Sequence, residues 1–307
     1  MTEVISIISP VFILIFIGFL FQKTKVVDRN FVLTSNKLIY YFCLPVLLFY
    51  KIYSTSIFDD LDLRTLSIMF VSILIINMLS LIVSYLFKLP AKTRNTFSFV
   101  TFRGNFTYVG LPVCYAAFGD KGLITASLLM AFTVPFINML SVVMLNLGKG
   151  GRFDIIVFLK NSLINPIVLA CITGLIFALL QIKPYGFVLN SMDMISNMTL
   201  PLALLCIGTI IDINQLAINH FLVLLTSIFK LLLLPLIAYV LVVLFGIEKE
   251  FNAKVLIILL ASPCATINYV LAASLKGDIE LAVSSIVVTT ILSGVAFIFW
   301  FYLLGLN

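Results

Sequence analysis

The stretch PVFILIFIGFLF, residues 10–21, decides the fold because it returns as PIVLACITGLIF, residues 166–177. Proline, glycine and the last phenylalanine stand at the same places in both copies, and the Leu-Pro pair at 44–45 recurs at 200–201 with the same spacing. A chain that repeats itself once inside apolar segments is predicted to consist of two structural copies. Many membrane transporters are built in this way, with a binding site at the middle of the bilayer.

The composition indicates that lipid is the solvent for much of the surface. Of the 307 residues, 62% are hydrophobic and only 10% are charged, against about 25% charged in a soluble domain. The net charge of +6 does not indicate a nucleic-acid partner, because the basic residues stand singly between apolar runs. The five cysteines are too far apart in the sequence for a metal or redox pair, so we expect neither a metal nor a cofactor.

Apolar segments of membrane-spanning length divide the chain evenly. We expect ten spans, each near the roughly 20 residues that a membrane helix needs, and five spans per copy make the second copy inverted. The predicted fold is an all-α membrane protein of two inverted five-helix repeats, residues 1–150 and 151–307, joined by the loop 148–152. The spans run roughly over 4–22, 31–53, 65–87, 96–117, 123–147, 162–181, 188–211, 218–246, 254–275 and 281–305.

The loop charges predict an orientation. Lysine and arginine are more frequent in the loops after the odd-numbered spans, and cytoplasmic loops carry the excess of positive charge. We therefore expect a multi-pass protein of the plasma or inner membrane with both termini outside.

Two of the predicted spans are interrupted at corresponding places in the two copies. The fourth reads FRGNFTYVGLP over residues 102–112, with Gly104, Gly110 and Pro112 as helix-breaking residues, and the ninth reads ASPCATINY over 261–269, with Pro263. Proline removes a backbone donor and glycine loosens the helix. Interrupted segments in register are the best sequence indication of a transport site; the alternative is a pair of kinks that serves packing.

Ionisable residues within the spans are basic. Lys37, Arg103 and Lys230 lie there, whereas the thirteen acidic residues fall at or near predicted loops. A charge in mid-bilayer costs about 2.5–3.5 kcal/mol on insertion scales and therefore needs a partner or a task. For Arg103 we expect an anionic substrate or a ring of backbone carbonyls, because its planar fork suits a carboxylate. Snorkelling to an interface is the alternative for all three.

The sequence gives little support for an enzyme or a channel. His220 is the single histidine, and the chain has no H-E-x-x-H, G-x-S-x-G or phosphate-binding loop. A channel needs a filter ring, whereas an internal duplication favours alternating access. We therefore expect a carrier rather than an enzyme.

The motifs resemble the auxin efflux carrier family, which includes the plant PIN carriers and bacterial proteins described as malate or malonate permeases, and more distantly the bile acid/sodium symporters. The resemblance covers essentially the whole chain. The residues that carry it are Asn105 with Gly110-Leu111-Pro112, Leu44-Pro45, Leu200-Pro201 with Gly208, Lys230 before Pro235, and Pro263 with Leu271-Ala272 and Gly277-Asp278.

The resemblance implies that the two interrupted helices cross, with spans 1, 2, 6 and 7 as a scaffold and spans 3–5 and 8–10 as a unit that moves like an elevator. By the same likeness, Asn105 is the polar residue that contacts a substrate carboxylate, and Pro112 is the first crossover proline. The chain departs from the plant carriers at Asn268, where they have a second proline. That change adds an amide to the expected site.

The sequence therefore predicts a secondary transporter for small organic anions, such as mono- or dicarboxylates or auxin-like acids, that exports them or lets them pass down the membrane potential. A sodium-coupled symporter and an anion-binding membrane receptor are the alternatives, and a homodimer stays open. The expected substrate-binding residues are Arg103, Asn105, Thr107, Tyr108, Thr266, Asn268 and Tyr269, with a charge role for Lys230 and Lys37.

Overall fold

The computed structural model describes residues 2–53, 62–147, 165–210 and 220–306. Helix accounts for 85% of the structure, and no strand occurs within these ranges. The expected all-α class is confirmed. The predicted boundary loop at 148–152 and the first residues of the predicted sixth span lie outside the described residues.

Within the described residues, the first half of the chain supplies six α-helices and two five-residue π-helical turns. Each predicted apolar segment of this half contains at least one of them. They are α1 (Thr2–Lys23), α2 (Arg29–Leu38), η1 (Ile39–Cys43), α3 (Leu44–Tyr53), α4 (Leu63–Leu86), α5 (Ala91–Phe102), η3 (Phe106–Gly110) and α6 (Leu111–Asn146).

The second half follows the same plan. Its ninth predicted segment is split into two short helices, as the fourth is split between α5 and η3. The elements are α8 (Pro166–Leu179), α9 (Gly186–Ile210), α10 (His220–Ile228), η5 (Phe229–Leu233), α11 (Leu234–Leu244), α12 (Phe251–Leu260), α13 (Asn268–Ser274) and α14 (Ile279–Leu303).

Within the described residues, seven helical stretches are long and apolar enough to cross a membrane. Large apolar side chains such as Phe16 and Val295 point outward on these helices, as lipid-facing residues do. One stretch, Phe106–Asn146, holds 41 residues, about twice the length that a single span needs. Gly119 divides it with φ 64° and ψ −153°, a conformation that only glycine adopts easily. The ten-span inverted arrangement stays a prediction.

Three Leu-Pro pairs lie inside apolar stretches without ending the helix. The pairs at 44–45, 111–112 and 234–235 each follow a π-helical turn directly. A proline cannot donate to the carbonyl four residues earlier and collides with it, and the wider turn makes room. For Pro235 that carbonyl belongs to Leu231, which accepts a hydrogen bond from the Trp300 indole at 2.9 Å.

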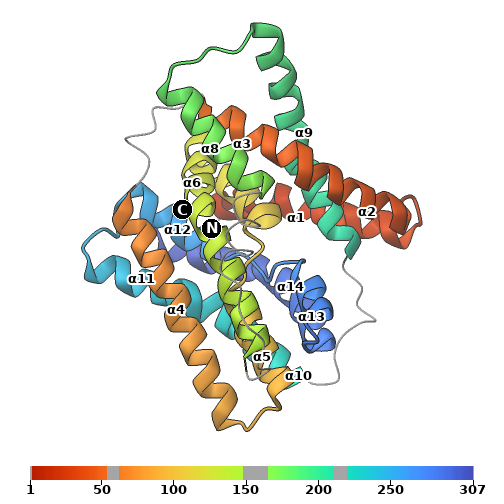
Figure 1. Cartoon of the computed structure of the whole chain (residues 1–307), viewed down its shortest axis with the longest axis vertical. Coiled ribbons are helices and arrows are strands. Elements are labelled where there is room, and N and C mark those ends of the chain that lie inside the picture. The colour runs from red at the N-terminus through yellow and green to blue at the C-terminus, as the bar shows by residue number, and fades with distance from the viewer. Residues whose placement is uncertain (1, 54–61, 148–164, 211–219, 307) are drawn as a thin grey trace.

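The helices form two groups along the long axis of the molecule (Figure 1). The helices α1, α2, α3, α8 and α9 gather in the upper part of the view, and α4, α5, α10, α11 and α13 in the lower part. In the upper group α1 packs along α9, and α3 packs along α8. The long helix α6 contacts both groups.

Glycines bring the backbones of α1 and α9 into direct contact. A Cβ on Gly18 would lie 2.0 Å from the carbonyl oxygen of Leu205, and one on Gly208 would lie 1.9 Å from that of Ile15. No side chain fits at these distances. The seam between α1 and α9 is therefore closed where Gly18 and Gly208 lie.

Asp62 caps the start of α4 outside the apolar stretch. Its carboxylate accepts hydrogen bonds from the backbone N–H groups of Arg64 at 3.0 Å and Thr65 at 3.2 Å, and from the Thr65 hydroxyl at 2.7 Å. Burial by itself raises the pKa of Asp62, but these hydrogen bonds outweigh it and hold the pKa below its usual value. The ionised cap thus satisfies two free donors of the first helical turn.

Candidate functional site

The two interrupted helices meet and pair through their backbones. Between α5 and η3 the chain is extended, and it runs antiparallel to the extended stretch that follows α12. The N–H of Asn105 donates to the carbonyl of Pro263 at 2.7 Å, and the N–H of Ala265 donates to the carbonyl of Arg103 at 3.0 Å. Backbone groups freed by an interrupted membrane helix need such partners. Here the backbone of each interrupted helix supplies hydrogen-bond partners for the backbone of the other.

The local sequence explains why the chains can approach so closely. A Cβ on Gly104 would lie 2.4 Å from the Phe106 ring and 2.9 Å from the Ser262 hydroxyl, so only glycine leaves room. On the opposite stretch Pro263 has no N–H to donate to a helix. Asn105 then starts the next helical segment, because its side-chain oxygen accepts from the N–H of Tyr108 at 3.3 Å.

The break in the first half lies earlier than the helix-breaking residues predict. Of the predicted set, Gly104 and Pro263 lie in the extended stretches, whereas Gly110 and Pro112 lie in continuous helix. The physical reason is the π-helical turn before Leu111, whose N–H reaches back to the carbonyl of Phe106 and accommodates the proline.

Arg103 stands at the break with its guanidinium buried against α6. Its Nη1 donates to the Ser141 hydroxyl at 3.2 Å and its Nη2 donates to Asn138 Oδ1 at 2.7 Å. The Nε has no partner among the described residues. Among the described residues, neutral side-chain oxygens therefore hold the two ends of the guanidinium, and the buried Nε–H remains for another acceptor, such as the anionic substrate expected from the sequence.

The two asparagines of the crossing are buried and oriented by backbone groups. Because Asn105 Oδ1 accepts from Tyr108, its Nδ2 is the group without a partner in the described part of the chain. Because Asn268 Nδ2 donates to the Arg103 carbonyl at 3.4 Å, its Oδ1 is likewise without a partner there. Buried polar atoms are nearly always hydrogen-bonded, so these groups mark a place that a polar ligand or water completes.

The other predicted site residues lie around the crossing in different ways. Thr107 and Thr266 are partly buried, and the Tyr108 hydroxyl donates to the carbonyl of Asn36 on α2 at 3.4 Å. Tyr269 is 45% exposed on α13. The crossing therefore brings together Arg103, Asn105 and Asn268 and leaves Tyr269 with much of its ring outside.

The two other predicted cations differ sharply. Lys37 is exposed on α2, as the snorkelling alternative expects. Lys230 is fully buried on η5, where its ammonium donates to the carbonyl of Leu260 at 2.7 Å and lies 5.7 Å from the centroid of the Phe106 ring. It therefore contacts the end of α12 and the start of η3, which are the edges of both breaks.

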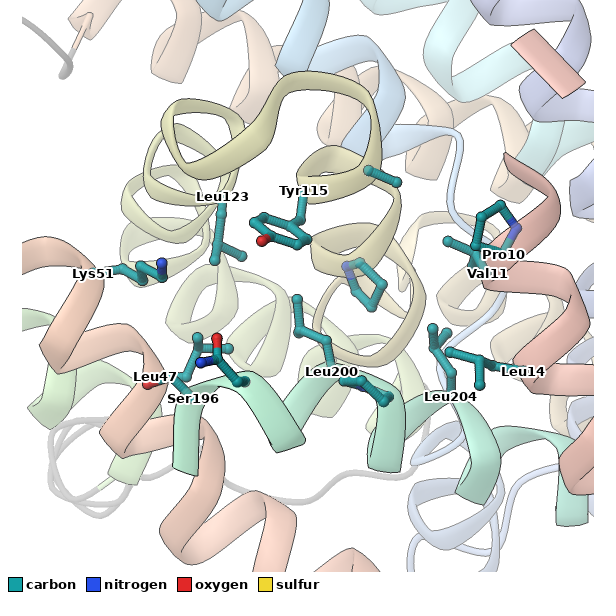
Figure 2. A pocket seen from close by; sticks show the side chains of 14 residues that line it. Pro10, Val11, Leu14, Leu47, Lys51, Tyr115, Leu123, Ser196, Leu200 and Leu204 are labelled. Atoms are coloured by element: carbon teal, nitrogen blue, oxygen red, sulfur yellow. The ribbon is translucent and has the colours of Figure 1, made fainter. Parts of the chain in front are cut away.

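A cavity of about 270 Å³ lies beside the crossing, between α6 and the helices α1, α3 and α9 (Figure 2). Pro112 is the one helix-breaking residue that lines it, and the predicted substrate-binding residues do not. The lining residues are Pro10, Val11, Leu14, Leu47, Lys51, Pro112, Tyr115, Ala116, Leu123, Ser196, Asn197, Leu200, Pro201 and Leu204.

Sequence reasoning missed Asn138, Ser141 and Lys51. Asn138 and Ser141 are three residues apart on α6, so they share a helix face; an amide and a hydroxyl at that spacing inside an apolar run are the signal that could have found them. Lys51 lies in the last turn of α3, and in the sequence it looks like an ordinary loop cation. Its place in a cavity wall depends on the packing of α3 against α6, which the sequence does not encode locally.

An all-helical multi-pass protein whose two broken helices cross around buried polar groups belongs to the class of membrane transporters. The chain is a member of the family described as "Membrane transport protein", whose model matches residues 3–301. The expected membership in the auxin efflux carrier type of membrane transporter is confirmed.

Two archaeal relatives are similar over nearly their whole length. An uncharacterized transporter of Methanocaldococcus jannaschii is 26% identical over 309 residues, which cover 97% of this chain and 98% of that protein. An uncharacterized transporter of Methanothermobacter thermautotrophicus is 25% identical over 306 residues, which cover 95% and 96%.

Proposed function

We propose that this membrane transporter is a secondary carrier of small organic anions, with the substrate bound at the crossing of its two broken helices. The observation that carries the proposal is the set of buried polar atoms without partners on Arg103, Asn105 and Asn268. Two of these atoms, the Arg103 Nε and the Asn105 Nδ2, are donors, and a carboxylate accepts from donors of this kind. Mono- and dicarboxylates and auxin-like acids are the substrates that this chemistry fits.

Each of the three groups has a distinct role in the proposal. The Arg103 guanidinium supplies the positive charge and one free N–H, and the Asn105 amide supplies a second donor to the same carboxylate. The Asn268 Oδ1 is an acceptor, so it suits a hydroxyl or a protonated carboxyl of the substrate. Thr107, Tyr108 and Thr266 line the approach, while the exposed ring of Tyr269 contributes at its edge.

The ten-span inverted repeat is part of the proposal. It is supported by reciprocal packing, since the first helix of each half contacts the second span of the other: α1 packs on α9, and α8 packs on α3. The reversal at Gly119 divides the long stretch into the second half of span 4 and span 5. In this arrangement the closed α1–α9 seam belongs to a scaffold, and the helices of the crossing move past it as an elevator.

The driving force in this proposal is the membrane potential, which favours anion exit by about 2.3 kcal/mol per charge per 100 mV. We place the carrier in the plasma or inner membrane with both termini outside, as the loop charges predict. Lys230 supports transport without sodium, because its ammonium already occupies a carbonyl at the end of α12, and unwound carbonyls are the groups that bind sodium in many carriers.

Counterflow in liposomes tests the proposal. Purified protein reconstituted with unlabelled succinate, malate or benzoate inside should accumulate the labelled acid from outside, and Arg103→Ala should remove this accumulation. A protein that binds an acid, as shown by a raised thermal midpoint, without any counterflow would be a receptor instead.

A further inference from the structure

The cavity beside the crossing has one charged residue in its wall. Most of the lining is apolar, and Lys51 supplies the positive charge (Figure 2). Ser196 and Asn197 on α9 are polar residues of the same lining. The Lys51 side chain is only 14% exposed. A largely buried ammonium among apolar groups retains its charge only with an anionic or hydrogen-bonding partner.

One partner of Lys51 comes from α6. The Lys51 Nζ lies 2.6 Å from Asp120 Oδ1, and the Asp120 side chain is 59% exposed. Asp120 does not line the cavity; it directly follows Gly119, whose positive φ turns the chain within α6. The ion pair therefore links α3 to the turn of α6 and fixes the Lys51 ammonium at the edge of the cavity.

We propose that Lys51 is an anion-binding residue of a second subsite and that Asp120 occupies, in this conformation, the place of a ligand carboxylate. This inference rests on the proposed function and adds a subsite to it. A carboxylate that enters the cavity replaces the Asp120 carboxylate on Lys51, so one ion pair is exchanged for another. The exchange also frees the turn of α6 from α3.

The lining selects the ligand class. The space is lined by leucines, among them Leu14, Leu47, Leu200 and Leu204. Among the described residues, Lys51 is the only cation in its wall. A second carboxylate would be buried there without a partner, at a high cost in desolvation. The volume of about 270 Å³ lies just below the usual range for ligand pockets. The subsite therefore fits a small monocarboxylate with an apolar body better than a dicarboxylate.

The other charged groups near this end of the cavity have partners of their own. Asp193 on α9 accepts a hydrogen bond from Asn197 at 3.1 Å. Lys121, the residue after Asp120, lies 4.9 Å from the centroid of the Phe251 ring and does not line the cavity. Lys121→Gln therefore removes the same charge from the same turn and serves as the matched control.

Calorimetric titration of the purified full-length protein with benzoate, and with the uncharged benzamide, tests the subsite. Asp120→Asn should bind benzoate about three- to tenfold more tightly, because a competing carboxylate is gone. Lys51→Gln should bind it at least about tenfold more weakly. Lys121→Gln should match the wild type, and neither Asp120→Asn nor Lys51→Gln should change benzamide binding.

A charge exchange guards against variants that fail to fold. The double variant Lys51→Asp with Asp120→Lys keeps an ion pair but moves the cation out of the cavity wall, so it should fold and bind benzoate as weakly as Lys51→Gln does. Absence of benzoate binding in the wild type, weaker binding in Asp120→Asn, or unchanged binding in Lys51→Gln would each overturn the subsite.

Counterflow separates this inference from the proposed function. If organic acids exchange across the membrane but the benzoate pattern is absent, the subsite is wrong and the carrier stands. If the benzoate pattern is present but no acid exchanges in wild-type liposomes, the subsite is a genuine anion site and the proposed transport is wrong.

Discussion

The two broken helices pair with each other but are completed differently. The first break carries its own cation, Arg103, whose guanidinium bonds to Asn138 and Ser141 on α6. The second break has no charged residue of its own, and Lys230 reaches it from η5 to donate to the Leu260 carbonyl. The two breaks therefore differ in their cations: Arg103 belongs to the first break, and Lys230 reaches the second from η5.

The amides of the two breaks are asymmetric as well. Asn105 leaves a donor without a partner, whereas Asn268 leaves an acceptor. In the proposed carrier, the first half supplies the donors that a carboxylate needs. The second half supplies an acceptor and an ammonium that completes the backbone. The proposal therefore assigns Arg103 to the ligand and Lys230 to the structure.

The largest expected effect is a loss of affinity for the acid when Arg103, but not Lys230, is replaced. Arg103→Ala should lower the affinity for the transported acid by about tenfold to a hundredfold, because a charge-assisted hydrogen bond contributes about 1.5–3 kcal/mol. Titration calorimetry on a variant that elutes as folded protein measures this. The affinity of Arg103→Lys, which keeps the positive charge but loses the planar guanidinium, should lie between those of Arg103→Ala and wild type. Equal affinity in Arg103→Ala and wild type would remove the assignment of Arg103 to the ligand.

The second cation should act on stability. Lys230→Met leaves the Leu260 carbonyl without its donor, so the free energy of unfolding should fall by about 1–3 kcal/mol, which thermal melts in detergent detect. The affinity of the folded fraction for the acid should change much less than in Arg103→Ala. A variant with an unchanged melting midpoint and lost binding would reverse the roles that the comparison gives to the two cations.

Replacing the two amides should affect different ligands. Asn105→Leu should weaken the binding of succinate and of malate to a similar extent. Asn268→Leu should weaken malate by about fivefold, since one neutral hydrogen bond contributes about 1 kcal/mol, and should leave succinate nearly unchanged, because only malate carries a hydroxyl. Competition of each acid against labelled succinate measures both. Equal losses for the two acids in Asn268→Leu would show that the acceptor does not read a hydroxyl.

The smallest expected effect is that of sodium. Because the Lys230 ammonium already binds a carbonyl at the second break, an imposed sodium gradient should leave the steady-state flux in proteoliposomes unaltered. Potassium in place of sodium at equal ionic strength is the control. A strong dependence on sodium would favour the symporter alternative and a cation site that Lys230 does not fill.

Much of the fold could be predicted because its signals are local. Runs of apolar residues gave the helical segments, and the glycine and proline at 104 and 263 marked the stretches that lie open in the structure. Pro112 was expected to break its helix because proline removes a hydrogen bond wherever it stands in an α-helix. A π-helical turn before it absorbs that defect, and the sequence carries no strong local sign of such a turn.

The site was predictable only in part because its partners come from distant segments. Arg103 and Asn105 stood out as polar residues at an interruption, and Asn268 as a departure from the related plant carriers. Their bonds to Asn138, Ser141 and the opposite backbone depend on which helices cross. The pair formed by Lys51 and Asp120 likewise joins two residues that each look like ordinary loop charges in the sequence.

A cryo-electron microscopy map of the protein with its organic acid bound would test the central claim most directly. We expect the stretches around Gly104 and Cys264 to lie side by side, with a ligand carboxylate within hydrogen-bonding distance of Arg103 Nε and Asn105 Nδ2. Continuous, separate helices in place of the two breaks, or an acid bound elsewhere while both asparagines are fully paired within the protein, would contradict the account.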